Sequence, residues 1–194
     1  MTGRAADGLL ASDLAAVAER LRAITVQVRG RGRGAGSGSG VVWRPGLVVT
    51  NAHVATGRSF VVETGDGAVR EADVVASDAR RDLAVLRVAT DRLPVAEVAP
   101  PGALRVGALV VAVGNPLGLS GAVTTGIVHA LPAPRRGAAL ILADLRLLPG
   151  NSGGPLSDAT GRVVGVNAMI LRGLAAAIPS DAVERYLERM RLAA

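Results

Sequence analysis

One serine in this sequence lies among glycines in a way that suits a nucleophile. Ser152 stands in the stretch LRLLPGNSGGPLSD, with Gly150 two residues before it and Gly153 and Gly154 directly after it. Glycine permits a tight turn and a close approach of the backbone to another group. A flexible linker would also be rich in glycine and serine, but here an apolar run precedes the stretch and Pro155 closes it. We therefore interpret the segment as a built turn that presents Ser152.

A serine hydroxyl is a weak nucleophile at neutral pH, so it needs a base and a third group that orients the base. The chain offers two histidines, His53 and His129. His53 follows an apolar run where the chain turns, which is a better place for a base than the interior strand position expected for His129. Asp82 directly precedes the apolar run LAVLRV and is the favoured orienting carboxylate. Asp78 is a weaker candidate because it stands in a turn.

The composition describes a small protein with an aliphatic core. The chain has 194 residues, 49% of them hydrophobic, which suffices for one domain or two small halves. Trp43, Phe60 and Tyr186 are the only aromatic residues. Cysteine is absent, which excludes disulfides and thiolate metal sites and leaves the redox compartment open. We expect neither a metal nor a cofactor.

The net charge of +6 comes with arginine as the only basic residue besides histidine. A basic balance can indicate nucleic-acid binding. The arginines are scattered, however, and no aromatic residues accompany them for stacking bases. The one local cluster, VRGRGRGAG at 28–36, is rich in glycine and is interpreted as a loop. We expect no nucleic-acid partner; the alternative is a binder that uses this loop.

Short apolar and β-branched runs between turn residues predict most of the secondary structure. A strand is expected from Thr25, and others are expected at 39–43, 47–50, 60–63, 69–77, 83–88, 109–114, 122–131, 138–142, 163–170 and 174–178. This pattern is typical of an antiparallel all-β protein, either a barrel or a sandwich. Helical spacing of apolar residues predicts a short helix near the N-terminus, capped by Ser12 or Asp13, and a second helix at the C-terminus, capped by Ser180. The proline-rich segment 92–107 is expected to connect two β halves.

The three candidate residues occur in the order His, Asp, Ser, which is the order of chymotrypsin-like enzymes. The surrounding motifs make the resemblance more specific: GSGSGVVW, VVTNAHVATG, SDARRDLAVLRV, LRVGALVVAVGNPLGLSGAVTTGIVHAL, PGNSGGPLSDATGRVVGVNAMI and AAAIPSDAVERYL. In order and rough spacing, these resemble the HtrA/Deg-type trypsin-like serine proteases of protein quality control. The resemblance implies an all-β, chymotrypsin-like fold of two antiparallel six-stranded β-barrels. A short helical N-terminal segment would occupy 1–22 and the protease domain 23–194, with barrels at about 23–95 and 103–179 and a helix at 180–192.

The resemblance also implies a role for each residue of the site. His53 would be the general base, Asp82 the orienting acid and Ser152 the nucleophile. The backbone N–H groups of Gly150 and Ser152 would form an oxyanion hole, with Asn151 contributing through the same turn.

The same resemblance places a substrate pocket before and after the serine turn. Its expected residues are Arg146, Asn167, Ala168, Met169, Ile170 and Ala176. Arg146 stands where relatives usually have a small residue. It could enter the pocket and favour an acidic or polar side chain, or it could turn to solvent or pair with Asp144. Because a buried unpaired charge is costly, we favour the second arrangement and expect a small aliphatic residue before the scissile bond.

Two functions remain in view from the sequence. The first is an endopeptidase that cleaves unfolded or extended polypeptides through an acyl-enzyme. The second is a catalytically silent binding module with the same fold. The family resemblance also raises the question whether the chain forms a homotrimer. Relatives carry a PDZ domain after the corresponding last helix, and we expect none within these 194 residues; no apolar run is long enough to span a bilayer. The compartment is open: extracytoplasmic if an export segment has been removed, and otherwise cytoplasmic.

Overall fold

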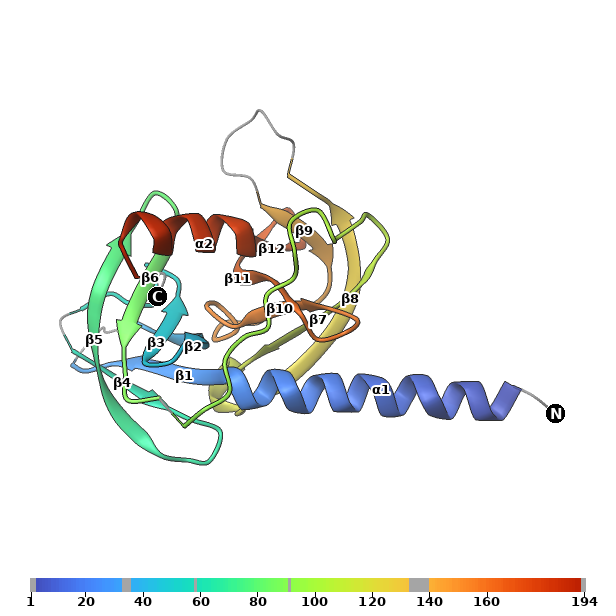
Figure 1. The fold of residues 1–194 in the computed structure, drawn as a ribbon, viewed down its shortest axis with the longest axis horizontal. Coiled ribbons are helices and arrows are strands. Elements are labelled where there is room, and N and C mark those ends of the chain that lie inside the picture. The colour runs from blue at the N-terminus through green and yellow to red at the C-terminus, as the bar shows by residue number, and fades with distance from the viewer. Residues whose placement is uncertain (1–2, 33–35, 58, 91, 133–139, 193–194) are drawn as a thin grey trace.

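The chain folds into two closed antiparallel β-barrels of six strands each, which confirms the fold that the resemblance implied (Figure 1). The structure is a computed structural model and describes residues 3–32, 36–57, 59–90, 92–132 and 140–192. The first barrel contains β1 (Thr25–Gly30), β2 (Ser37–Arg44), β3 (Leu47–Thr50), β4 (Phe60–Glu63), β5 (Val69–Asp78) and β6 (Leu83–Arg87). The second barrel contains β7 (Leu109–Gly114), β8 (Ala122–Ala130), β9 (Ile141–Asp144), β10 (Pro155–Asp158), β11 (Val163–Leu171) and β12 (Leu174–Pro179).

The two barrels share one strand order. Around the first barrel the strands run β1-β2-β3-β6-β5-β4, and around the second they run β7-β8-β9-β12-β11-β10. Closure leaves no free sheet edge in either barrel. Between the barrels, the described residues of 88–108 form no strand and make one isolated bridge, Val98 to Val163.

The hydrophobic core has three parts: the interior of each barrel and a cluster between them. Adjacent residues of one strand serve different parts. Val42 of β2 is buried inside the first barrel, whereas Val41 and Trp43 are buried in the cluster between the barrels. Successive strand side chains point to opposite faces, so burial of both faces explains why these strands are apolar runs and not alternating ones.

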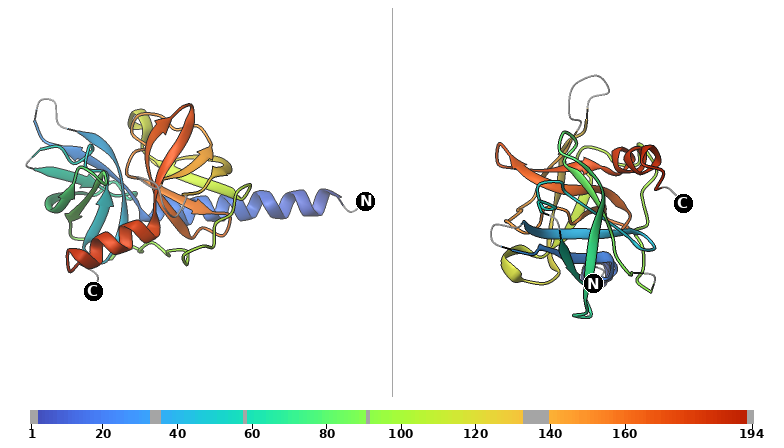
Figure 2. Two further views of the ribbon diagram at one scale, coloured as in Figure 1. Left: turned by 90° about the horizontal axis from the view of Figure 1, so that it is seen from above. Right: turned by 90° about the vertical axis from the view of Figure 1, so that its left-hand side faces the viewer.

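Helix α1 (Gly3–Ile24) precedes the first barrel and is longer than the short helix expected. The expected cap at Ser12 or Asp13 is wrong, because both residues lie inside the helix. The segment before them is rich in alanine and leucine, the strongest helix formers, so the helix begins earlier. Figures 1 and 2 show the N-terminal half of α1 extending beyond the barrels.

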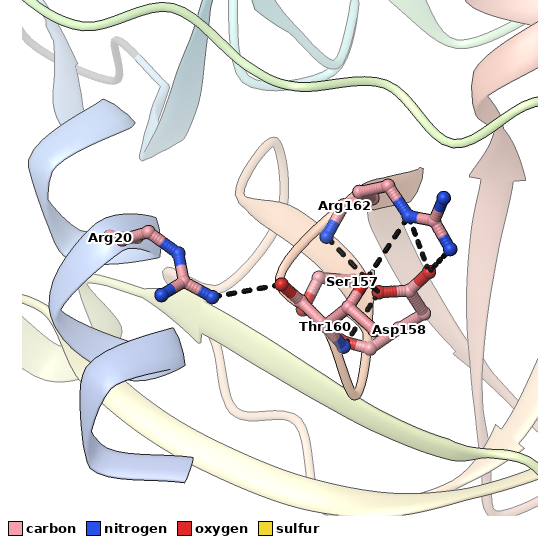
Figure 3. A network of polar contacts seen from close by, with 5 residues as sticks. All are labelled: Arg20, Ser157, Asp158, Thr160 and Arg162. Carbon is pink, nitrogen blue, oxygen red and sulfur yellow. Dashed lines mark hydrogen bonds and ion pairs between the residues drawn. The ribbon is translucent and has the colours of Figure 1, made fainter. Parts of the chain in front are cut away.

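The C-terminal half of α1 is attached to the second barrel (Figure 3). The Arg20 guanidinium donates to the Thr160 carbonyl in the β10–β11 turn at 2.8 Å. That turn is ordered by Asp158, whose carboxylate accepts hydrogen bonds from the backbone N–H groups of Thr160 and Arg162. Because α1 continues directly into β1, the helix joins the first barrel to the second.

Helix α2 (Ser180–Arg189) follows the second barrel and lies along one side of the molecule, in contact with both barrels (Figure 2). Val183 and Leu187 are fully buried, as the apolar spacing predicted, whereas Met190 is exposed at the C-terminal end. Ser180 is the first residue of the helix and makes no capping hydrogen bond, so the expected cap is wrong there as well. Glu184 accepts hydrogen bonds from the side chains of Trp43 and Arg44 in β2.

Two strands differ from the sequence-based expectation. Strand β10 was not expected, because it is short, begins with Pro155 and follows two glycines. Proline is tolerated there because it is the first residue of the strand. Strand β9 begins at Ile141 and ends at Asp144, later than the 138–142 expected, and residues 138–139 lie outside the described residues.

Candidate active site

The Asp82 carboxylate and the His53 ring lie in direct contact. Ring Nδ1 lies 2.8 Å from Asp82 Oδ2 and 2.9 Å from Oδ1, and the backbone N–H of His53 donates to Oδ1 at 3.0 Å. Because a carboxylate only accepts hydrogen bonds, Nδ1 carries the proton and Nε2 is left as an acceptor. The His53 side chain is half exposed and that of Asp82 is 19% exposed. The structure thus brings together His53 and Asp82, which were paired from the sequence.

A buried asparagine helps to aim this carboxylate. Asp82 adopts a left-handed backbone conformation, with φ of 53°. The side chain of Asn51, which is fully buried, donates to the Asp82 carbonyl at 3.0 Å. The Asn51 carbonyl accepts from the N–H groups of Val54 and Ala55, which closes the turn that presents His53. Asn51 was not among the residues predicted from the sequence, although it stands only two residues before His53.

The pKa of His53 is raised above its ordinary value of 6.5. The hydrogen bond to Asp82 is the largest cause, and the Asp82 charge acts in the same direction; partial burial opposes both. The protonated ring is therefore stabilised at this position.

In the serine turn, every carbonyl from 149 to 152 is held by a hydrogen bond. The Pro149 carbonyl accepts from Leu117 N–H, and the Asn151 carbonyl from Gly154 N–H. Two carbonyls are held by one residue of the first barrel: Ser39 Oγ donates to the Gly150 carbonyl at 2.7 Å, and Ser39 N–H to the Ser152 carbonyl at 2.7 Å. With its carbonyls fixed, the turn has a defined direction for each of its N–H groups.

Two N–H groups of this turn have no acceptor among the described residues: those of Gly150 and Ser152. They are the two donors that the family resemblance implied for an oxyanion hole. The N–H of Asn151 differs, because it donates to the Leu148 carbonyl at 3.0 Å and closes the turn. Asn151 therefore shapes the turn and does not offer a third backbone donor.

Glycine at position 150 is required by both conformation and space. Its φ is 105°, a region that side-chain-bearing residues rarely adopt. A Cβ at this position would lie 2.6 Å from the Asn115 carbonyl oxygen and 2.8 Å from Pro116 Cα.

The serine turn lies against the segment that carries His53. A Cβ at Gly38 would touch both the Val54 side chain, at 2.7 Å, and the Ser152 carbonyl, at 2.8 Å. The Ser152 hydroxyl, however, donates to the Ala168 carbonyl at 2.9 Å. No hydrogen bond joins it to the His53 ring, although the structure describes both residues. The two side chains lie on neighbouring segments but are not bonded to each other.

The alternative residues lie elsewhere. His129 is exposed on β8, in the second barrel. Asp78 ends β5, and its carboxylate pairs with Arg81 and accepts from the backbone N–H of Arg80. The structure does not bring either residue to Ser152.

Known proteins of similar sequence identify the family of this chain. The family model described as a trypsin-like peptidase domain matches residues 38–166, which include His53, Asp82 and Ser152. This chain belongs to the trypsin-like peptidase domain family. Within it, the chain is 39% identical over 159 residues to serine protease HTRA1 of Xenopus laevis, covering 76% of this chain and 34% of the relative. This peptidase domain spans only 34–38% of the length of the first curated relatives it matches.

Solved structures give the same result. The HtrA-type protease AlgW with a decapeptide matches the domain with a TM-score of 0.82 and 27% identity, covering 92% of this chain and 67% of that chain. A serine endoprotease from Yersinia pestis matches with a TM-score of 0.82 and 31% identity, covering 90% and 65%. The resemblance to HtrA-type proteases that the motifs indicated is therefore confirmed.

A pocket of about 170 Å³ lies beside Ser152 of this trypsin-like peptidase domain. It is lined by Leu147, Leu148, Pro149, Asn151, Ser152, Met169 and Ile170. Of the residues expected there, Met169 and Ile170 line it. The sequence did not assign three further lining residues to the pocket, although they directly precede Gly150: Leu147, Leu148 and Pro149.

The other expected pocket residues take different places. Arg146 is exposed and does not line the pocket. Asn167 is buried and donates through its side chain to the Pro155 carbonyl, while the Ala168 carbonyl receives the Ser152 hydroxyl. Ala176 is fully buried and pairs with Met169 across β11 and β12.

The described residues contain no group of three or more His, Asp or Glu side chains that could hold a metal ion. In the same part of the chain, no helix combines the length and the apolar character that a membrane span needs.

Proposed function

We propose that this chain is a serine endopeptidase in which Ser152 is the nucleophile, His53 the general base and Asp82 the orienting acid. The observation that carries the proposal is the Asp82–His53 pair beside a serine turn with two unused N–H groups. A positioned imidazole and preorganised donors are the two requirements of acyl transfer to serine.

The proposed reaction begins with a rotation of the Ser152 side chain. In this step the hydroxyl leaves the Ala168 carbonyl and turns towards His53 Nε2 by a change of the χ1 rotamer. Ser152 Oγ then attacks the substrate carbonyl carbon while Nε2 takes its proton. The oxyanion is stabilised by the N–H groups of Gly150 and Ser152. Collapse breaks the C–N bond, and the amine departs with the proton from Nε2, which leaves an acyl-enzyme.

Deacylation repeats these steps with water. His53 Nε2 takes a proton from the water molecule, whose oxygen attacks the ester carbonyl. Collapse of the second tetrahedral intermediate expels Ser152 Oγ, which recovers its proton from His53. The products are a new carboxylate and a free enzyme.

The proposed substrates are extended or unfolded polypeptides with a small aliphatic residue before the scissile bond. The small volume of the pocket and its aliphatic lining by Leu147, Leu148 and Ile170 support this preference. A role in protein quality control is proposed from the similarity to HtrA-type proteases.

A serine-directed phosphonate probe tests the proposal directly. We expect it to label the wild-type protein at Ser152, and we expect casein digestion that the Ser152→Ala variant lacks. Ser59→Ala, which removes an exposed serine outside the 149–152 turn, is the matched control and should keep both signals. No labelling of the folded wild-type protein would overturn the proposal and favour a silent binding module.

We also propose that this chain assembles into a homotrimer, as the family resemblance indicated. Light scattering on the purified chain tests this assembly, and a monomer mass at micromolar concentration would contradict it.

A further inference from the structure

We propose that Ser39 is a positioning residue that sets the oxyanion hole from the opposite barrel. Ser39 lies in β2, inside the GSGSG stretch, and is fully buried. It belongs to the first barrel, whereas the serine turn that it contacts belongs to the second, 111 residues further along the chain. The inference rests on the proposed function, because it concerns the same turn.

The Ser39 hydroxyl joins three segments at one oxygen atom. It donates to the Gly150 carbonyl at 2.7 Å. It accepts from the backbone N–H of Asn115 at 2.8 Å and from the Asn115 side chain at 3.3 Å. Asn115 is itself fixed, since its side-chain oxygen accepts from Gly121 N–H at 2.9 Å. The hydroxyl therefore uses its single proton and both of its lone pairs.

The bond to Gly150 acts on the peptide that lies between the two proposed donors. This Gly150–Asn151 peptide is held at one end by Ser39 Oγ on its carbonyl and at the other by the Leu148 carbonyl on its N–H. A rotation of the peptide would break both bonds and would turn the neighbouring Gly150 and Ser152 N–H groups away from each other. Glycine at position 150 provides little resistance to such a rotation by itself. The Ser39 hydroxyl supplies the missing constraint.

The backbone of Ser39 adds a second constraint on the same turn. Its N–H donates to the Ser152 carbonyl at 2.7 Å, and its own carbonyl is held by the Thr50 hydroxyl at 2.6 Å. A substitution of the Ser39 side chain leaves these backbone bonds in place. The hydroxyl can therefore be tested separately from the packing of β2 against the turn.

The test compares Ser39→Ala and Ser39→Cys with the wild-type protein. Cysteine is close in size to serine but is a weak hydrogen-bond donor, so this variant keeps the packing while weakening the bond to Gly150. The substrate is a fluorogenic peptide with valine before the scissile bond. The inhibitor is the corresponding peptidyl trifluoromethyl ketone, whose tetrahedral adduct places an oxyanion in the hole. Active sites are counted by phosphonate titration.

We expect kcat per active site to fall at least about tenfold in both variants, with little change in KM, because the lost interaction acts on the transition state. The affinity for the trifluoromethyl ketone should fall by a similar factor, which a purely structural role would not cause. Thr25→Val is the matched control. It removes a buried hydroxyl that donates to the Leu21 carbonyl, away from the turn, and should lower thermal stability while leaving kcat unchanged.

The inference is overturned if Ser39→Cys retains wild-type kcat and inhibitor affinity per active site. It is also overturned if the losses match those of Thr25→Val. If Ser39→Ala does not fold, the cysteine variant decides alone. Failure of the wild-type protein to react with the phosphonate contradicts the proposed function instead, so the two failures are distinguishable.

Discussion

The Asp82 carboxylate contacts both the backbone N–H and the ring Nδ1 of His53. One carboxylate oxygen accepts the backbone N–H at 3.0 Å, and the other lies 2.8 Å from Nδ1. The bond to the backbone N–H fixes the position of the His53 main chain, and the bond to Nδ1 fixes the tautomer and the plane of the ring. Both depend on the left-handed backbone of Asp82, which the Asn51 side chain holds.

Asp82→Asn should abolish most of the activity. An amide can present a donor to Nδ1 and so favour the wrong tautomer, for which the expected loss in kcat is on the order of 10⁴-fold. Hydrolysis of the fluorogenic peptide measures the effect, with circular dichroism as the check on folding. Asp78→Asn is the control: its carboxylate pairs with Arg81, so it should retain activity within a few-fold of wild type. Equal losses in the two variants would contradict the assignment of Asp82.

The raised pKa of His53 predicts the pH dependence of kcat/KM. The base must be neutral to accept the serine proton, so activity should rise with pH and reach half its maximum above pH 6.5. Because His53 and His129 are the only histidines, proton NMR can follow both rings, and a His129→Gln variant assigns them. Asp82→Asn should move the His53 midpoint downward. A wild-type midpoint at or below 6.5 would be inconsistent with the Asp82 contact.

The same shift predicts a contribution of His53 to stability. Because the folded pKa is raised, the contribution is fully present below about pH 6.5 and is lost as the pH rises through the folded value. Thermal unfolding of wild type and His53→Gln should therefore differ more at pH 5.5 than at pH 9. The half-exposed ring keeps this difference small. An equal difference at both pH values would argue against the shift.

Gly150→Ala should reduce activity far more than stability alone explains. The new Cβ would meet the Asn115 carbonyl oxygen at 2.6 Å, which forces the turn and its two N–H groups to move. Gly107→Ala is the matched control, since Gly107 has φ of 84° but open space around its Cβ position. That variant should lose only about 1–2 kcal/mol of unfolding free energy, which is the cost of a left-handed backbone at a residue with a Cβ. It should keep its kcat. Similar kcat values in the two variants would contradict the proposed hole.

Arg146 should not set the substrate preference. Because it is exposed and lies outside the pocket, Arg146→Glu should leave the ranking of residues before the scissile bond unchanged. A peptide library should show valine preferred over aspartate at that position by at least about tenfold, since the pocket has an aliphatic lining. If the wild-type protein cleaves peptides with an acidic residue before the scissile bond and Arg146→Glu does not, then Arg146 reaches the pocket.

The sequence was most informative where residue type and local pattern agree. His53 and Ser152 each follow an apolar run, Asp82 directly precedes one, and the order of the three along the chain narrowed the fold class. The apolar strand runs predicted most of both barrels, because β-branched residues buried on both faces leave a continuous signal. Strand β10 left no such signal, since Pro155 and the preceding glycines are also typical of a loop.

Contacts between distant segments could not be read in this way. The bond from Ser39 to Gly150 joins residues 111 positions apart, and a serine between glycines also suits a loop. The pocket residues Leu147 and Leu148 lie in an irregular segment, where no periodicity tells which way a side chain points. The rotamer of Ser152 depends on the Ala168 carbonyl, which only the three-dimensional register of β11 brings near.

Each terminal helix adjoins one barrel in the sequence and bonds to the other barrel. Helix α1, which leads into the first barrel, bonds to the second through Arg20 and Thr160. Helix α2, which follows the second barrel, bonds to the first through Glu184 and Arg44. The covalent connection at 92–107 is therefore not the only link across the seam, because both helices and the bonds of Ser39 also join the barrels. A single proteolytic nick in that connection should leave two fragments that stay associated and fold back together after dilution from denaturant.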